Sequence, residues 1–351
     1  MNYNNNFDQD RQPESGYTYV QGLGFVPFGP AYKERTSLIT CANAIGLAVL
    51  LYLFLRVAIP DYVVRVLMLF VPEIRYFNSH LMAPEWITQI IDGTCFLLSN
   101  FIAYGLYMLF IRIPVKVALP LKRPQASVTV ASVLIALAVS VLGSILTSAI
   151  GRVFGFVGLI PIMPDISVSL TPTGLIAALV NICILPAFVE EFVFRGVLLQ
   201  SLRRFGDGFA LAISSIIFSM LHLNFIQAPV ALLTGFVIGY FVIRTGSVLT
   251  GVIIHFINNF LALIQQIIMP LLSQHLADIV NLLVVLVYLI LGLVAMVLLA
   301  RSSDNLFELK TIPSSFSVRK RAKMFFSCPA MVIAIVLIAS LSLHSIQRLP
   351  R

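Results

Sequence analysis

The chain has 351 residues, of which 59% are apolar and only 11% are charged. Several apolar runs reach the roughly 20 residues that a helix needs to cross a bilayer, so the sequence predicts an all-α, polytopic bundle of transmembrane helices. The net charge of +8 does not indicate a nucleic-acid partner, because the basic residues follow the loops instead of forming one soluble surface.

Residues 1–37 are polar and contain four acidic residues but no apolar segment of the kind that a cleaved signal peptide needs. We expect them to form a disordered cytoplasmic tail. The short apolar run 63–71 is interrupted by Arg65, so it is predicted to lie at the interface and not to span the membrane.

Nine apolar spans follow this tail, which predicts a bundle of eight to nine transmembrane helices. They cover residues 38–59, 87–111, 127–150, 173–202, 208–223, 228–243, 247–269, 279–300 and 327–346. The predicted domains outside the core are N-terminal helices over 38–126, a basic cytoplasmic loop over 301–326 and a last helix within 327–351.

Lys and Arg are distributed unequally between the two ends of these spans. Arg195 lies inside a span, sixteen of the others lie at one end, and six lie at the opposite end: Arg56, Arg65, Arg75, Arg152, Arg348 and Arg351. Because cytoplasmic loops carry the excess of basic residues, the N-terminus is predicted to be cytoplasmic and the C-terminus external. The four cysteines are far apart and mostly in apolar runs, which favours single thiols over disulfides or a metal cluster.

Three charged residues lie inside the apolar run 174–202, where an ionisable side chain costs roughly 3 kcal/mol to insert. Glu191 and Arg195 are four residues apart and share a helix face, so we expect them to form an ion pair. Glu190 points about 100° away on the same helix and has no local partner. A carboxylate in that position is a candidate general base.

Further polar residues occur in the following spans, at His222, His255 and Asn259. Counting 1.5 Å per residue from the span ends places them and Glu190 at depths of roughly 12 to 22 Å, so one shared polar cavity is predicted. Pro186 lacks the N–H that would bond the carbonyl of Ile182, one turn before Glu190. It either opens the helix for a substrate or only shapes its packing.

Two features have a structural interpretation. Ala231, Gly235 and Gly239 place small residues on one helix face, which favours close helix packing. Asp92 lies near a span end without any motif around it, so we interpret it as interfacial or structural.

The motifs resemble those of the CAAX-protease and bacteriocin-processing family of intramembrane proteases, also called the ABI or CPBP family. The resemblance rests on their order along three polar helices: Glu190-Glu191-x-x-x-Arg195, then Phe218-x-x-x-His222, then His255-x-x-x-Asn259. It covers the predicted core 127–300. It implies endoproteolysis near the carboxyl terminus of a membrane-bound or lipidated substrate, with a cavity open to membrane and cytosol.

The resemblance also implies residue roles. Glu190 with His222 would activate water, His255 with Asn259 would stabilise the oxyanion, and Glu191 with Arg195 would hold the helix geometry. The family is labelled a metalloprotease, and Glu190, His222 and His255 are the residues that would bind Zn²⁺ or another divalent ion. The sequence has neither His-Glu-x-x-His nor a Gly-x-Ser-x-Gly elbow.

Two other functions stay open at this stage. Glu and His at mid-membrane also form proton relays in transporters, although no repeated halves are found here. A non-catalytic immunity or scaffold protein on the same fold would keep all of these residues. In each case the expected surroundings are membrane lipids, and the expected location is the plasma membrane.

Overall fold

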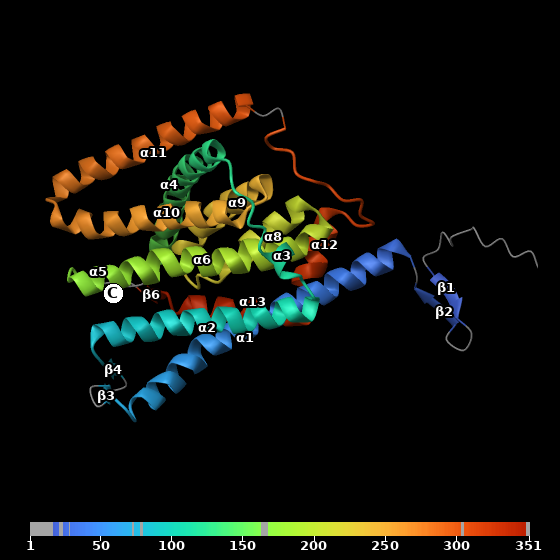
Figure 1. Cartoon of the computed structure of the whole chain (residues 1–351), viewed down its shortest axis with the longest axis horizontal. Helices are drawn as coiled ribbons and strands as arrows, with labels where there is room; N and C mark the ends of the chain where they lie inside the picture. Colours follow the sequence, from blue (N-terminus) through green and yellow to red (C-terminus); the bar gives the residue numbers. More distant parts are fainter. Residues whose placement is uncertain are drawn as a thin grey trace, which may run out of the picture.

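The fold is a bundle of helices, as the composition predicts (Figure 1). This computed structural model describes residues 17–20, 24–27, 29–71, 74–77, 80–162, 168–302 and 305–348. The helices outside the central one are α1 Pro30–Leu67, α2 Glu85–Ile111, α3 Val115–Ala118, α4 Ala126–Phe156, α8 Asp207–Met220, α9 Gln227–Thr245, α10 Val248–Ile268, η4 Met269–Leu271, α11 Gln274–Ser302, α12 Val318–Phe326 and α13 Pro329–Leu343.

The strands are short and form three antiparallel pairs within the described residues. These pairs are β1 Tyr17–Val20 with β2 Gly24–Pro27, β3 Arg75–Phe77 with β4 His80–Met82, and β5 Leu159–Pro161 with β6 Ile346–Arg348. The pairing of β5 with β6 joins the chain after α4 to the segment after α13, so the last helix is fixed to the bundle at that end.

The number of candidate spans agrees with the lower end of the predicted eight to nine, and is smaller than the nine apolar runs of the sequence. Among the described residues, seven helices are long and apolar enough to cross a membrane, or eight if α12 and α13, which meet at a 73° bend, count as one. The missing span is α8, predicted over 208–223, which has only 14 residues. At 1.5 Å per residue it is about 21 Å long, shorter than the roughly 30 Å hydrocarbon layer.

The first helix is longer at both ends than predicted. It begins at Pro30, inside the predicted tail, and proline is well suited to a first helical turn because its φ is already helical. It continues to Leu67, so most of the 63–71 run belongs to α1 and is not a separate interfacial segment. The prediction of disorder for residues 1–16 lies outside the described residues.

The predicted basic connector 301–326 contains structure of its own. Helix α12 lies in it, and Arg321 of this helix is buried and donates to the Phe205 carbonyl. Before α12, the Ser315 N–H donates to Glu34 of α1 at 2.8 Å. The connector is therefore packed onto the start of α1 and the end of the central helix.

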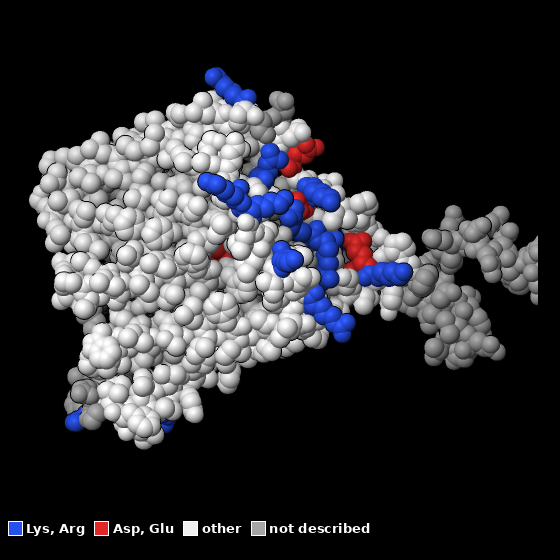
Figure 2. All heavy atoms as spheres, in the orientation of Figure 1, with Lys and Arg blue, Asp and Glu red and all other residues white. Residues whose placement is uncertain are grey.

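The basic side chains gather at the end of the bundle where α1 begins, with few at the opposite end (Figure 2). Strand β6, which follows the last helix, lies toward the opposite end (Figure 1). This arrangement agrees with the predicted charge asymmetry. The assignment of the basic end to the cytoplasm stays a prediction.

The four cysteines are free and buried. Two of them contact neighbouring polar atoms: Cys41 Sγ lies 3.5 Å from the Tyr107 hydroxyl, and Cys328 Sγ donates to the Met324 carbonyl at 3.2 Å. They contribute to helix packing, as the sequence predicts.

The central helix, residues 172–205, carries the three charges found inside an apolar run. Its parts are α5 Pro172–Ala178, η1 Leu179–Ile184, α6 Leu185–Glu191, η2 Phe192–Leu198, α7 Leu199–Leu202 and η3 Arg203–Phe205. Segments η1 and η2 are π-helical and flank α6. Such wide turns frequently occur at functional sites, and here they bracket Glu190 and Glu191.

Candidate active site

Arg195 and Glu191 form the ion pair that their spacing predicts. Arg195 Nη1 donates to Glu191 Oε1 at 2.8 Å, and their side chains are only 2% and 0% exposed. A charge buried to this degree is stable only when paired and hydrogen-bonded, so the two side chains depend on each other.

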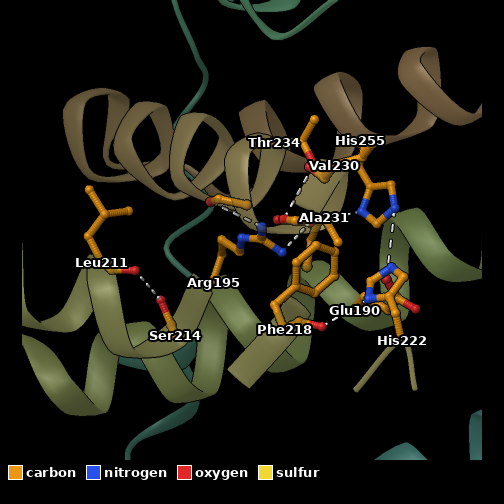
Figure 3. Close-up of polar contacts among 12 residues, drawn as sticks. Glu190, Arg195, Leu211, Ser214, Phe218, His222, Val230, Ala231, Thr234 and His255 are labelled. Carbon is orange, nitrogen blue, oxygen red and sulfur yellow. Dashed lines mark hydrogen bonds and ion pairs between the residues drawn. The ribbon is translucent and has the colours of Figure 1, made fainter. Parts of the chain in front are cut away.

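Arg195 also joins the central helix to two further helices (Figure 3). Its Nη2 donates to the Gly235 carbonyl of α9 at 3.2 Å, and its guanidinium lies 4.4 Å from the ring centroid of Phe218 on α8. A Cβ at Gly235 would lie 3.1 Å from Phe218 Cδ1 and 3.4 Å from Nη2. The small residues of α9 thus permit the close packing that the sequence predicts.

His255 is bound to the same carboxylate, a contact that the sequence analysis missed. Its Nδ1 lies 2.9 Å from Glu191 Oε1. Because a carboxylate only accepts, Nδ1 carries the proton and donates it. This orients the opposite nitrogen, Nε2, toward Glu190 Oε2 at 3.8 Å. Glu191 therefore holds both Arg195 and His255.

His222 lies in the turn after α8, not within a span. Its Nδ1 donates to the Phe218 carbonyl at 2.9 Å. In this tautomer the other ring nitrogen, Nε2, carries a lone pair and can act as a base. The Phe218 ring packs edge to face against both imidazoles, with its centroid 4.9 Å from that of His222 and 6.1 Å from that of His255. Phe218 thus supports both rings.

Glu190 and His222 line one cavity of about 190 Å³. Its other lining residues are Tyr52, Arg56, Phe96, Asn100, Phe194, Phe218 and Leu221. Of the three residues predicted to share a cavity, Glu190 and His222 therefore line it. His255 is 6% exposed and is not among the lining residues, although its Nε2 lies 3.8 Å from Glu190 Oε2.

Helices α1 and α2 supply part of this lining, through Tyr52, Arg56 and Asn100. From the sequence, Arg56 was predicted to be one of the basic residues at span ends, without a role in a site. An arginine within an apolar run was the one signal available, because such a residue usually faces a cavity.

Asn259 does not line the cavity. Its Nδ2 donates to the Ile182 carbonyl at 3.0 Å, across from α10 to the central helix. This is the carbonyl that Pro186 cannot bond, because proline has no N–H. The structure thus uses Asn259 to satisfy the backbone at the proline and does not bring it to the predicted oxyanion position.

This arrangement predicts a coupling between Asn259 and Pro186. Replacing Asn259 with Ala should destabilise the protein by roughly 1–3 kcal/mol, because the Ile182 carbonyl loses its partner. In a Pro186→Ala background the restored N–H can bond that carbonyl, so the same replacement should have a smaller effect. Thermal unfolding of the four proteins in detergent measures the coupling, and strictly additive effects would contradict it.

Gly251 lies beside the second Glu191 oxygen. Among the described residues this buried Oε2 has no hydrogen-bond partner, and a Cβ at Gly251 would lie 2.7 Å from it and 2.9 Å from Val242 Cγ2. Both neighbours are fixed in the core. Only glycine lets α10 approach the carboxylate closely enough for His255 to bind it.

We therefore expect Gly251→Ala to destabilise the protein by roughly 1–3 kcal/mol, the usual effect of overpacking, and to displace Glu191 from His255. Gly105→Ala in α2 is the matched control, since no atom of the described part of the chain lies within 4 Å of its added Cβ. It should be neutral or slightly stabilising. Unfolding curves compare the two, and an equal effect would show that Gly251 is not closely confined.

The described residues do not assemble a metal site. No group of three or more His, Cys, Asp or Glu side chains among them could hold a metal ion. Of the predicted set, Glu190 and His222 line one cavity and His255 Nε2 lies 3.8 Å from Glu190 Oε2, but the three do not form such a group.

Residues 172–261 match the family described as Rce1-like, type II CAAX prenyl endopeptidase Rce1-like. This segment holds every motif residue from Glu190 to Asn259, so the resemblance inferred from the motifs is confirmed. Neither the curated proteins nor the solved structures include a match to the chain. Together with the apolar helices, the family match supports an integral membrane protease of the CAAX type.

Proposed function

We propose that this CAAX-type protease is an intramembrane endopeptidase that uses Glu190 and His222 to activate water. Its substrate would be a membrane-bound or lipidated protein or peptide. The observation that carries the proposal is the shared cavity of about 190 Å³, which both side chains line. A water has a volume of about 30 Å³ in the liquid, so the cavity accommodates a nucleophilic water beside a peptide group.

In the proposed reaction, the Glu190 carboxylate accepts a proton from water as the oxygen attacks the peptide carbonyl carbon. The carbonyl becomes an oxyanion, which a positioned hydrogen-bond donor stabilises. When the C–N bond breaks, the proton passes to the leaving amine. His222 Nε2 would orient the water, because Nδ1 is fixed to the Phe218 carbonyl.

His255 is the proposed oxyanion donor. With Nδ1 held by Glu191, its Nε2 is directed toward Glu190, and in the doubly protonated ring this nitrogen would donate to the oxyanion. Glu191 and Arg195 position this ring and do not contact the substrate. Asn259 supports the backbone one turn before Glu190 instead of serving as a second donor.

The proposal is tested with the purified full-length chain in lipid vesicles and a peptide carrying a single membrane anchor. Mass spectrometry should detect one defined cleavage, and elemental analysis of the same sample determines whether activity follows metal content. Binding of anchored peptides without any cleavage would favour the non-catalytic scaffold. A proton flux on substrate addition, again without cleavage, would favour the transporter.

A further inference from the structure

Arg56 stands out among the cavity residues, because it is a cation beside the proposed catalytic carboxylate. It lies on α1 and lines the cavity together with Glu190 and His222. Its guanidinium carbon lies 5.7 Å from the ring centroid of Phe96 on α2, a cation–π contact. Helix α1 lies outside the 172–261 segment that matches the family, so the match assigns no role to this residue.

The guanidinium has no salt bridge within 4.0 Å among the described residues. Asp92 on α2 is close enough to influence it electrostatically, yet it does not line the cavity. Arg195 differs, because its guanidinium is hydrogen-bonded to the Glu191 carboxylate and the Gly235 carbonyl. Arg56 therefore has donors available for a ligand in the cavity.

An arginine placed this way is suited to a carboxylate. Its planar guanidinium presents a fork of N–H donors that binds carboxylates in a bidentate manner, and it stays charged in a partly apolar environment. Glu190 itself must remain available to accept the proton from water, so it does not serve as the permanent partner. The cavity of about 190 Å³ is large enough for the end of a peptide chain.

We propose that Arg56 binds the C-terminal carboxylate of the substrate and so positions the scissile bond at Glu190. This inference rests on the proposed function. The resemblance already implies cleavage near the carboxyl terminus, and the inference names the residue of this chain that would recognise that terminus. Arg56 is a specificity residue in this account, because it contacts the chain end and takes no part in proton transfer.

The test compares two anchored peptides that are identical except for a C-terminal carboxylate or carboxamide. A charged hydrogen bond contributes about 1.5–3 kcal/mol, so the wild-type protein should cleave the carboxylate peptide with a roughly 10- to 100-fold higher kcat/KM. Arg56→Ala and Arg56→Gln should lower this ratio to about one. Arg56→Lys, which keeps the charge without the fork, should give an intermediate ratio.

Arg65→Ala is the matched control on the same helix, since Arg65 pairs with Asp61 at 2.8 Å and does not line the cavity. It should keep the wild-type ratio. A merely structural role of Arg56 would reduce cleavage of both peptides alike and leave the ratio unchanged. Asp92→Asn tests whether the electrostatic interaction of Arg56 with Asp92 contributes to the preference. This variant should keep the carboxylate preference.

The outcomes distinguish this inference from the function on which it rests. Equal cleavage of both peptides by the wild-type protein would overturn the role of Arg56 and leave the endopeptidase proposal standing. A preference that persists in Arg56→Ala and Arg56→Gln would also overturn it. If the protein cleaved neither peptide, and no anchored peptide of any other length, the result would count against the proposed function instead.

Discussion

Glu190→Gln is expected to abolish peptide cleavage while the protein stays folded. The amide has nearly the same shape as the carboxylate but cannot accept the proton of the attacking water. Glu190 is not part of the buried pair, and its side chain is 20% exposed, so the substitution should change the unfolding temperature little. Initial rates on an anchored peptide, measured beside thermal unfolding, test both parts of the expectation.

Glu308→Gln is the control for this substitution, since Glu308 is exposed and lies in the connector before α12. It should retain wild-type cleavage. Substantial activity in Glu190→Gln would show that another group is the base and would contradict the role proposed for the cavity.

His255→Ala should lower kcat by something like the 10²–10³-fold seen when one oxyanion donor is removed.

Arg195→Ala should have the largest effect on stability. Its removal leaves the fully buried Glu191 with only the His255 contact, and loss of one member of a buried ion pair typically destabilises by about 3–5 kcal/mol. The contacts to Gly235 and Phe218 are lost at the same time. We expect a strongly reduced yield of folded protein and a lower unfolding temperature in detergent.

Arg65→Ala provides the comparison, because Arg65 and Asp61 form an ion pair with the same four-residue spacing on α1. Their side chains are 71% and 53% exposed, and exposed pairs contribute only about 0.2–1 kcal/mol. If the two variants unfolded at the same temperature, burial of the Arg195 pair would not be what stabilises the site.

Local spacing predicted the contacts that lie within one helix. Glu191 and Arg195 meet because side chains four residues apart share a helix face, and that geometry does not depend on the rest of the fold. The same spacing separated Glu190 from them and indicated its different role. The helical, membrane-spanning architecture likewise followed from the length of the apolar runs.

Contacts between distant helices were outside the reach of this reasoning. Spacing cannot show that the Glu191 carboxylate also binds His255, 64 residues later, or that Asn259 donates to Ile182. The carbonyl left free by Pro186 was visible in the sequence, but its partner was not. The same holds for Arg56 and Tyr52, which reach the cavity only through the packing of α1.

Span ends were also predicted less well than spans. An apolar composition does not show where a helix stops, so α8 was expected to extend to residue 223, whereas the helix ends at Met220 and His222 lies in the turn. This difference matters for the site. It places the His222 ring in the lining of the cavity, with Nδ1 bound to the Phe218 carbonyl of the preceding turn.

A structure of the Glu190→Gln protein with an uncleaved anchored peptide tests the central claim most directly. The account predicts that the scissile carbonyl lies in the cavity between residue 190 and His222, with its oxygen toward His255 Nε2. A peptide bound elsewhere would contradict it, above all in the cavity of about 470 Å³ between α2 and the start of the central helix, which Gln89 and Asn181 line.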